Sequence, residues 1–153
     1  MMKQHSKSTP KQIKQFHRAV NKTLKDFNLF PNEARILVAC SGGPDSMVLL
    51  DVLQYVKVHR KSRWTIGVTT MDHSIRRESL SELQMVESYC NKRNLPFWGI
   101  KKDIPAMAGE RKESLETVGR YERYKWFNEL AEREHYEYIV TAHHKDDQGE
   151  TIL

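Results

Sequence analysis

Short apolar runs alternate with longer amphipathic segments along most of the chain, and this alternation limits the fold more than any other feature. The short runs are rich in β-branched residues, as strands buried inside a sheet are. The longer segments repeat apolar residues every three or four positions, which is the period of a helix. The predicted strands are 35–40, 64–72, 97–103 and 137–143, and the predicted helices are 10–28, 47–56, 78–94, 111–134 and 144–153. This order predicts an α/β fold in which a parallel sheet carries helices on both faces.

Composition narrows the class of protein. A chain of 153 residues is long enough for one compact domain with a real core, and 39% apolar with 29% charged residues is typical of soluble proteins. No apolar run approaches the roughly 18 residues of a membrane span, and the N-terminal lysines precede no apolar signal segment. Cys40 and Cys90 form no CxxC pair, which argues against a disulfide framework or a cysteine metal site. We expect a cytoplasmic protein with no membrane contact.

Positive charge is concentrated at the start of the chain. Residues 1–30 hold seven Lys and Arg against the single acid Asp26, whereas the remaining residues hold 18 basic against 19 acidic side chains. Such a segment suits contact with a polyanion such as RNA. A helix with a solvated charged face would have the same composition, so both interpretations stay open.

The loop Ser-Gly-Gly-Pro-Asp-Ser, residues 41–46, separates the first predicted strand from the following helix. Its two glycines permit positive φ angles and a close approach of a ligand to the backbone. Exposed N–H groups before a helix N-terminus bind anions. Asp45 would repel a phosphate unless a divalent cation lay between them, so the loop predicts a nucleotide phosphate with Mg²⁺. The alternative is an ordinary turn capped by Asp45 or Ser46, which leaves the second glycine unexplained.

Polar segments follow three of the predicted strands at the point where each strand ends. They are SGGPDS after the first strand, DHSIRR after the second and HHKDDQ after the fourth. The carboxyl ends of parallel strands meet at one edge of the sheet, where ligands of such folds bind. We therefore expect one site built from all three segments. Neither GxxxxGK(S/T) nor GxGxxG is present, so a Walker ATPase or dinucleotide fold is not indicated.

The loop SGGPDS resembles the PP-loop of N-type ATP pyrophosphatases, which cleave ATP between its α and β phosphates. MDHSIRRES (71–79), LETVGRYERY (115–124) and TAHHKDDQGETIL (141–153) are similar to three further elements of the tRNA(Ile)-lysidine synthases. The resemblance implies a Rossmann-like adenine nucleotide alpha hydrolase fold. We expect a basic N-terminal helix at 1–30 and a PP-loop ATP-binding domain at 31–153 that is incomplete at its C-terminus.

The resemblance also assigns roles to residues of this chain. It implies nucleotide binding by Ser41, Gly42, Gly43, Pro44, Asp45, Ser46, His73 and Arg76. It implies catalysis by Asp45, Arg120, His143 and Asp147, with Asp45 and Asp147 as Mg²⁺ ligands. Whether His143 moves a proton or steadies charge, and whether Asp147 holds Mg²⁺ or an amine, stays open. Two positions depart from the family pattern: Pro44 replaces a small residue such as valine, and Gly119 replaces alanine.

The activity implied by the resemblance is the modification of tRNA(Ile) with a CAU anticodon. ATP adenylates the C2 carbonyl oxygen of the wobble cytidine, and the ε-amine of L-lysine then displaces AMP to give lysidine. The expected cofactors are ATP and Mg²⁺, and the oligomeric state is open, with a homodimer as one option. The alternatives are a tRNA 2-thiolation enzyme, which would use cysteine motifs, and a non-catalytic nucleotide-binding module.

Several residues have a plain structural interpretation. Cys40 is expected to be a small buried residue rather than a nucleophile, and Arg123 is assigned equally to an ion pair or to the site. Aromatic residues of the predicted helix 111–134 are expected in the core rather than on an RNA-stacking surface. They are Tyr121, Tyr124, Trp126 and Phe127.

Overall fold

A computed structural model describes residues 14, 30–41, 43–141 and 151–152. Lys14 is helical, and the rest of the predicted helix 10–28 lies outside the described residues. Gly42 and the segment 142–150, which includes His143 and Asp147, also lie outside them. The division into a basic helix and a nucleotide-binding domain therefore stays a prediction.

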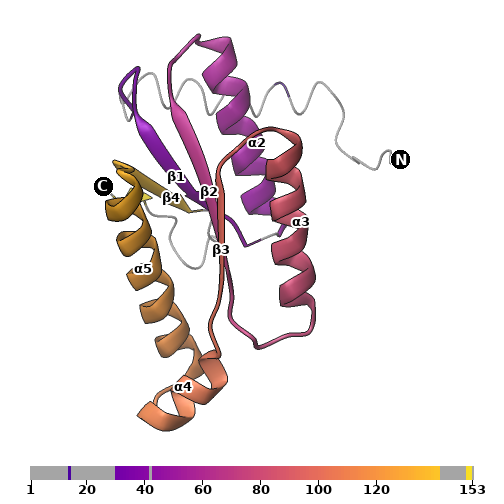
Figure 1. Cartoon of the computed structure of the whole chain (residues 1–153), viewed down its shortest axis with the longest axis vertical. Coiled ribbons are helices and arrows are strands. Elements are labelled where there is room, and N and C mark those ends of the chain that lie inside the picture. Colours follow the sequence, from indigo (N-terminus) through magenta and orange to yellow (C-terminus); the bar gives the residue numbers. More distant parts are fainter. Residues whose placement is uncertain (1–13, 15–29, 42, 142–150, 153) are drawn as a thin grey trace.

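The described chain forms a sheet of five strands with helices between them (Figure 1). The elements are β1 (Arg35–Ala39), α2 (Pro44–His59), β2 (Thr65–Asp72), α3 (Glu78–Lys92), β3 (Phe97–Lys101), α4 (Ile104–Arg111), α5 (Leu115–Glu134), β4 (Tyr138–Thr141) and β5 (Thr151–Ile152). The strand order is β3-β2-β1-β4-β5, and the first four are parallel. The predicted α/β fold is confirmed. None of the described helices has the length and apolarity that a membrane crossing requires.

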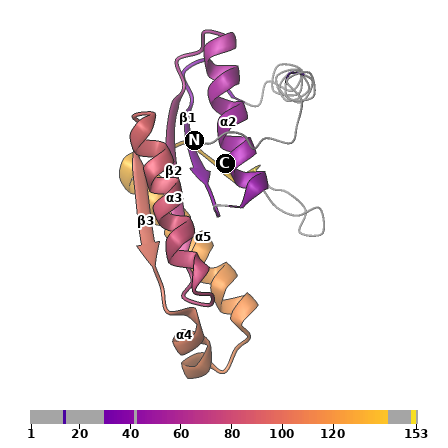
Figure 2. The same cartoon turned by 90° about the vertical axis from the view of Figure 1, so that its right-hand side faces the viewer.

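Alternate residues of β1 divide the core into two layers. Ile36 and Val38 are fully buried and belong to the cluster that includes residues of α2 and α3, whereas Leu37 packs with Phe127 and Leu130 of α5. A strand that buries both faces has no polar residues in its buried part, which is why residues 36–40 are an unbroken apolar run. Figure 2 shows the helices and the sheet turned by 90° from the view of Figure 1.

The predicted helix 111–134 is wrong at its start. Arg111 ends α4, a helix that the sequence did not predict, and Lys112 follows in the left-handed conformation with φ 55°. The α5 helix begins at Leu115 because the Ser114 hydroxyl accepts a hydrogen bond from the amide of Thr117 at 3.0 Å. Gly119 lies within α5 and does not interrupt it.

The predicted helix 144–153 is also wrong where the structure describes it. Thr151 and Ile152 form β5, which pairs antiparallel with Val140 and Ile139 of β4. An edge strand exposes unpaired N–H and C=O groups, so a β-branched segment that reaches it gains more from pairing than from a helix. The sheet therefore has an antiparallel edge beside its four parallel strands.

Candidate functional site

A cavity lies at the carboxyl edge of the sheet, beside the point where the strand order reverses between β1 and β4. Its volume is about 200 Å³, and it is lined by residues from the ends of β1, β2 and β4 and from α5. Among the predicted site residues, Ser41, His73 and Arg76 line this cavity, whereas the described residues 43–46 do not. The topology thus brings Ser41 of the first polar segment and His73 and Arg76 of the second to one place. The third segment, HHKDDQ, lies outside the described residues, so its part in the site stays a prediction.

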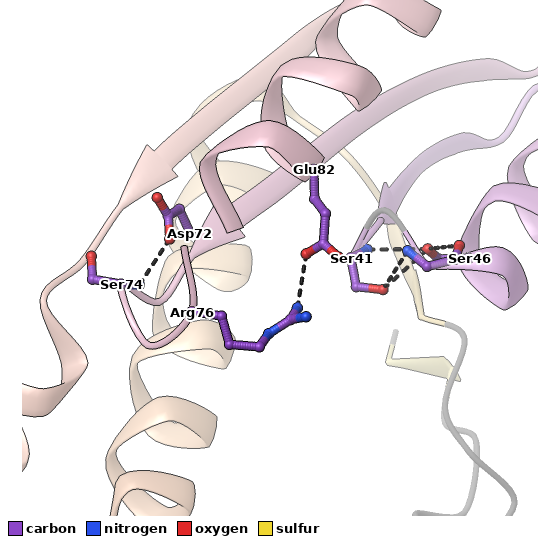
Figure 3. A network of polar contacts seen from close by, with 7 residues as sticks. Ser41, Ser46, Asp72, Ser74, Arg76 and Glu82 are labelled. Atoms are coloured by element: carbon purple, nitrogen blue, oxygen red, sulfur yellow. Dashed lines mark hydrogen bonds and ion pairs between the residues drawn. The ribbon is translucent and has the colours of Figure 1, made fainter. Parts of the chain in front are cut away.

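The loop before α2 is held together by the hydroxyl of Ser46, which is only 2% exposed. Its Oγ accepts a hydrogen bond from the amide of Ser41 at 3.1 Å and donates one to the carbonyl of Gly43 at 3.1 Å (Figure 3). The amide of Gly43 donates to Ser41 Oγ at 3.2 Å. Ser46 therefore clamps the loop in this conformation, while Ser41 is exposed and lines the cavity.

The helix α2 starts without a side-chain cap. Gly43 is its N-cap residue, so the alternative of a turn capped by Asp45 or Ser46 is wrong. Gly43 has φ −74° and an extended backbone, so the positive φ angle that its glycine would permit is not used at this position. Pro44 occupies the first turn, where a proline loses no helical hydrogen bond and its fixed φ suits the helix. Its place in the first turn explains why proline is accepted here where the family pattern has a small residue such as valine. The backbone amides that follow Pro44 in the first turn have no partner within the helix and point out of its N-terminus.

Asp45 is exposed in the first turn of α2. No group of three or more metal-ligating side chains occurs within the described ranges 30–41 and 43–141. Mg²⁺ in nucleotide sites is usually held by one or two carboxylates, with phosphate oxygens and waters as the other ligands. A single exposed carboxylate at an anion-binding helix end fits that donor set. Asp147, the second predicted ligand, lies outside the described residues.

The segment after β2 is a tight turn built on Asp72, which is 3% exposed. Its carboxylate accepts a hydrogen bond from the amide of Ser74 at 2.8 Å, and Ser74 has φ 60°. The same turn carries Arg76, whose guanidinium donates to Glu82 of α3 at 2.8 Å (Figure 3). This exposed ion pair is weak, so Arg76 can exchange Glu82 for a phosphate with little loss.

His73 lies between that turn and α5. Burial lowers the pKa of its imidazole, the positive charge of Arg123 lowers it further, and Asp72 partly opposes both. Its Nε2 is shielded from solvent and has no hydrogen-bond partner in the described part of the chain. A Cβ at Gly119 would lie 3.5 Å from the His73 ring, so the alanine usual in the family would make an ordinary contact here. His73 is therefore a neutral hydrogen-bonding group at neutral pH.

We expect the protein to lose stability as the pH falls below the ordinary histidine pKa, about 6.5, towards the lower folded-state pKa of His73. In that window the unfolded chain binds the proton and the folded chain does not, so acid favours unfolding. NMR titration of the ring protons should give a midpoint below 6.5. Replacing His73 with glutamine should remove the part of the pH dependence of the unfolding free energy that His73 causes. An unchanged pH dependence would contradict the lowered pKa of His73.

A second and larger cavity, of about 1060 Å³, runs along α5 and shares His73 and Arg123 with the first. Arg120, the predicted catalytic arginine, lines only this larger cavity. The guanidinium carbons of Arg120 and Arg123 lie 5.2 and 5.6 Å from the ring centre of Tyr124. The sequence left Arg123 open between an ion pair and the site, and its position three residues after Arg120 puts both on one helix face.

The aromatic residues of α5 divide between core and surface. Phe127 is 3% exposed, as predicted, and Tyr124 and Trp126 are half-buried beside the core. Tyr121 is 60% exposed and lines the larger cavity, so its predicted core position is wrong. Arg120 before it is also exposed and lines the same cavity, whereas Glu122 after it is buried.

A buried carboxylate fixes the position of α5. Glu122 is 1% exposed and accepts a hydrogen bond from Arg111 of α4 at 2.9 Å, and Lys102 lies 3.6 Å from its other oxygen. Burial alone would raise the Glu122 pKa, but the Arg111 hydrogen bond and the nearby positive charges outweigh burial and lower it. The two ion pairs of Glu122 hold α4 and the residue after β3 against the helix that carries Arg120 and Arg123.

Both cysteines are buried and unbonded to each other. Burial raises the pKa of the Cys40 thiol to about 12 and that of Cys90 to about 11. Thiolates are the reactive form of cysteine, so neither side chain is a nucleophile at neutral pH. The prediction that Cys40 is a small buried residue is confirmed.

Solved structures share this fold. The U34-tRNA thiolase NcsA from Methanococcus maripaludis superposes with a TM-score of 0.72 at 18% identity, covering 88% of this chain and 46% of that protein. An NH3-dependent NAD synthetase from Campylobacter jejuni superposes with a TM-score of 0.55 at 15% identity, covering 88% of this chain and 56% of the synthetase. At these identities the likeness shows the fold alone.

Sequence comparison is more specific. The tRNA(Ile)-lysidine synthase of Thermosipho africanus is 38% identical over 130 residues, which are 85% of this chain and 30% of the relative. That of Petrotoga mobilis is 33% identical over 92% of this chain and 45% of its own length, so the chain spans less than half of either relative. The family model for the PP-loop domain matches residues 11–153. The chain belongs to the PP-loop domain family.

Proposed function

We propose that this chain is the ATP-binding part of a tRNA(Ile)-lysidine synthase. Such an enzyme joins L-lysine to C2 of the wobble cytidine in tRNA(Ile) with a CAU anticodon, through an adenylated cytidine. Membership of the PP-loop family supports the use of ATP, and the curated relatives named above support tRNA as the substrate. The finer assignment rests on the four matching segments together.

One observation carries the proposal. The cavity beside the loop after β1 adjoins a groove about five times larger, and the two share His73 and Arg123. A reaction that joins ATP to a second large substrate needs two adjoining spaces with positive charge at their junction, and Arg123 supplies that charge here. We assign the smaller cavity, together with the start of α2 to which Ser41 is hydrogen-bonded, to the nucleotide phosphates. We assign the larger groove to the base that receives the adenylate.

In the first step the C2 carbonyl oxygen of cytidine attacks the α-phosphorus, and the bond to the bridging oxygen breaks as pyrophosphate leaves. Amides at the start of α2 and the exposed Ser41 bind the phosphates, and Arg120 and Arg123 offset the negative charge that develops. Bound Mg²⁺, held by Asp45, would supply further charge neutralisation. In the second step the lysine amine attacks C2, AMP leaves with the C2 oxygen, and the amine loses its proton.

The remaining predicted residues complete the proposal. We assign a proton-transfer or charge-stabilising role to His143 and an Mg²⁺- or amine-binding role to Asp147, and we keep Gly42 in the phosphate loop. All three follow from the family pattern, as does the proposed division into a basic helix at 1–30 and an ATP-binding domain at 31–153. The proposed location is the cytoplasm.

The alternative of a 2-thiolation enzyme finds no support in the cysteines of this chain. That chemistry needs a reactive sulfur or a cluster ligand, and both thiols here are buried with raised pKa values. A non-catalytic nucleotide-binding module is distinguished only by assay.

The proposed function is tested by incubating the complete protein with ATP, Mg²⁺, L-lysine and unmodified tRNA(Ile). We expect AMP and pyrophosphate in equal amounts, with formation of the modified cytidine dependent on lysine and detected by nucleoside mass spectrometry. Incorporation of sulfur instead of lysine would support the thiolation alternative. ATP binding without AMP formation in the presence of both substrates would support the non-catalytic module.

A further inference from the structure

The turn between α2 and β2 carries a concentration of positive charge at the opposite end of α2 from the candidate ATP loop (Figure 1). Residues 57–63, which we call the basic turn, contain Lys57, Arg60, Lys61 and Arg63 and no acidic residue. Lys61 and Arg63 are exposed, and Lys57 and Arg60 are half-buried. The α2 helix has 16 residues, and at the rise of a helix it separates the two sites by about 24 Å.

Backbone hydrogen bonds hold the basic turn in one conformation. The amide of Arg60 donates to Val56, that of Lys61 to Val58 and that of Ser62 to Lys57, at 2.9, 3.1 and 3.0 Å. Lys61 adopts the left-handed conformation with φ 54°. Because the backbone is already ordered, a ligand that binds here pays little conformational entropy for the turn itself.

The N-terminal segment enters the fold directly beside the basic turn. Phe30 packs edge-on against Trp64 with 5.6 Å between ring centres, and the Trp64 indole donates to the carbonyl of Pro31 at 2.9 Å. The amide of Arg63 donates to the carbonyl of Asn32 at 2.8 Å. Residues 30–32, where the basic N-terminal stretch ends, therefore contact the residues at the end of the basic turn.

Charge is divided unequally along the sequence. Residues 1–30 and the basic turn together hold 11 Lys and Arg against one acidic residue, whereas all other residues hold 14 against 19. The negative end of the α2 dipole accounts for Lys57 and His59 in the last helical turn. It does not account for Lys61 and Arg63, which follow the helix. Arg63 pairs with Glu33, but both side chains are largely exposed, so this pair is weak.

We propose that the basic turn is a docking surface for the phosphate backbone of RNA, remote from the ATP loop. The inference rests on the proposed function for the identity of the RNA, since a tRNA held at both ends of α2 would be oriented with its anticodon at the catalytic edge. Contacts to phosphates position a nucleic acid without reading its bases. The surface therefore contributes affinity and orientation, while the choice of nucleotide belongs to the catalytic site.

The test is a pair of double variants of the complete protein. Lys57→Gln with Lys61→Asn removes two charges from the basic turn, and asparagine is chosen because it tolerates the left-handed conformation. Lys101→Gln with Lys112→Asn is the matched control, since both lysines are exposed and Lys112 has φ 55°. Binding of a fluorescently labelled, unmodified tRNA(Ile) transcript is measured by anisotropy across a range of salt concentrations, with ATP binding measured in parallel.

We expect the turn variant to bind the transcript about tenfold more weakly near 0.1 M salt and to lower the slope of log K against log salt by about one to two. The control should bind as the unaltered protein does, and ATP binding should be the same in all three. Equal binding by the turn variant, or an equal loss in the control, overturns the inference.

The two proposals fail separately. Normal lysine incorporation with unchanged RNA binding by the turn variant overturns the docking surface alone. Weakened RNA binding by the turn variant, in a protein that forms no modified cytidine, supports the docking surface and overturns the proposed function.

Discussion

Replacing Asp45 with alanine is expected to abolish ATP–pyrophosphate exchange and AMP formation while the fold remains intact. The carboxylate is exposed in the first turn of α2, so its loss removes no buried contact. It costs only the favourable interaction with the helix dipole, about 0.3 to 1 kcal/mol. In the proposed site the same carboxylate holds Mg²⁺ against the phosphates. Removing that charge stabilisation should lower the rate by about a thousandfold or more.

Glu78→Ala is the matched control for Asp45→Ala. Glu78 is also an exposed acid in the first turn of a helix, in this instance α3, and it lines neither cavity. Both variants should lose the same small amount of stability in urea unfolding, and only Asp45→Ala should lose activity. Full adenylation by Asp45→Ala contradicts the metal assignment. A comparable loss of activity in Glu78→Ala would show that the effect is not specific to the loop.

The strands of the sheet were predictable because their signal is local. A strand buried on both faces is apolar along its buried part, as β1 is from Ile36 to Ala39, and that run is visible in the sequence. The β5 pairing was not predictable, because Thr151 and Ile152 lie next to β4 only in the folded chain. The start of α5 was missed although Ser114 is a good N-cap residue, because the charged segment before it also suits a helix.

The location of the candidate site followed from topology, whereas its internal contacts did not. Polar residues at the ends of parallel strands meet at one edge whatever their side chains do. The sequence could not show that the Ser46 hydroxyl is used to clamp the loop, or that Arg76 pairs with Glu82. It could not show that Arg123 lies where two cavities meet. Such contacts depend on distances between elements, which local patterns do not contain.

Gly67→Ala is expected to cause the largest loss of stability among conservative substitutions in the sheet. Gly67 lies in β2 and pairs with Leu37 of β1. A Cβ there would overlap the hydroxyl of Tyr136 and lie 2.6 Å from its Cζ and 3.0 Å from the ring of Trp98. Tyr136 is 8% exposed and packs edge-on against Trp98, so its ring has little room to withdraw. Overpacking of this kind costs about 1 to 3 kcal/mol.

Gly109→Ala is the matched control for that overlap. Gly109 is exposed in α4, and a Cβ there would meet nothing within 4 Å. Alanine should therefore stabilise the protein by about 0.5 to 1 kcal/mol, because glycine is unfavourable inside a helix. In thermal unfolding, Gly67→Ala should lower the midpoint by several degrees and Gly109→Ala should raise it slightly.

A double variant identifies Tyr136 as the cause. The overlap with its ring is the proposed reason that Gly67→Ala lowers the free energy of unfolding. In a Tyr136→Leu background, leucine leaves room for the added methyl group. There the loss caused by Gly67→Ala should be smaller by at least about 1 kcal/mol. Free energies of unfolding in urea for the four proteins give this coupling directly. Additive effects would show instead that Gly67 is required by the strand backbone, and the packing explanation would be wrong.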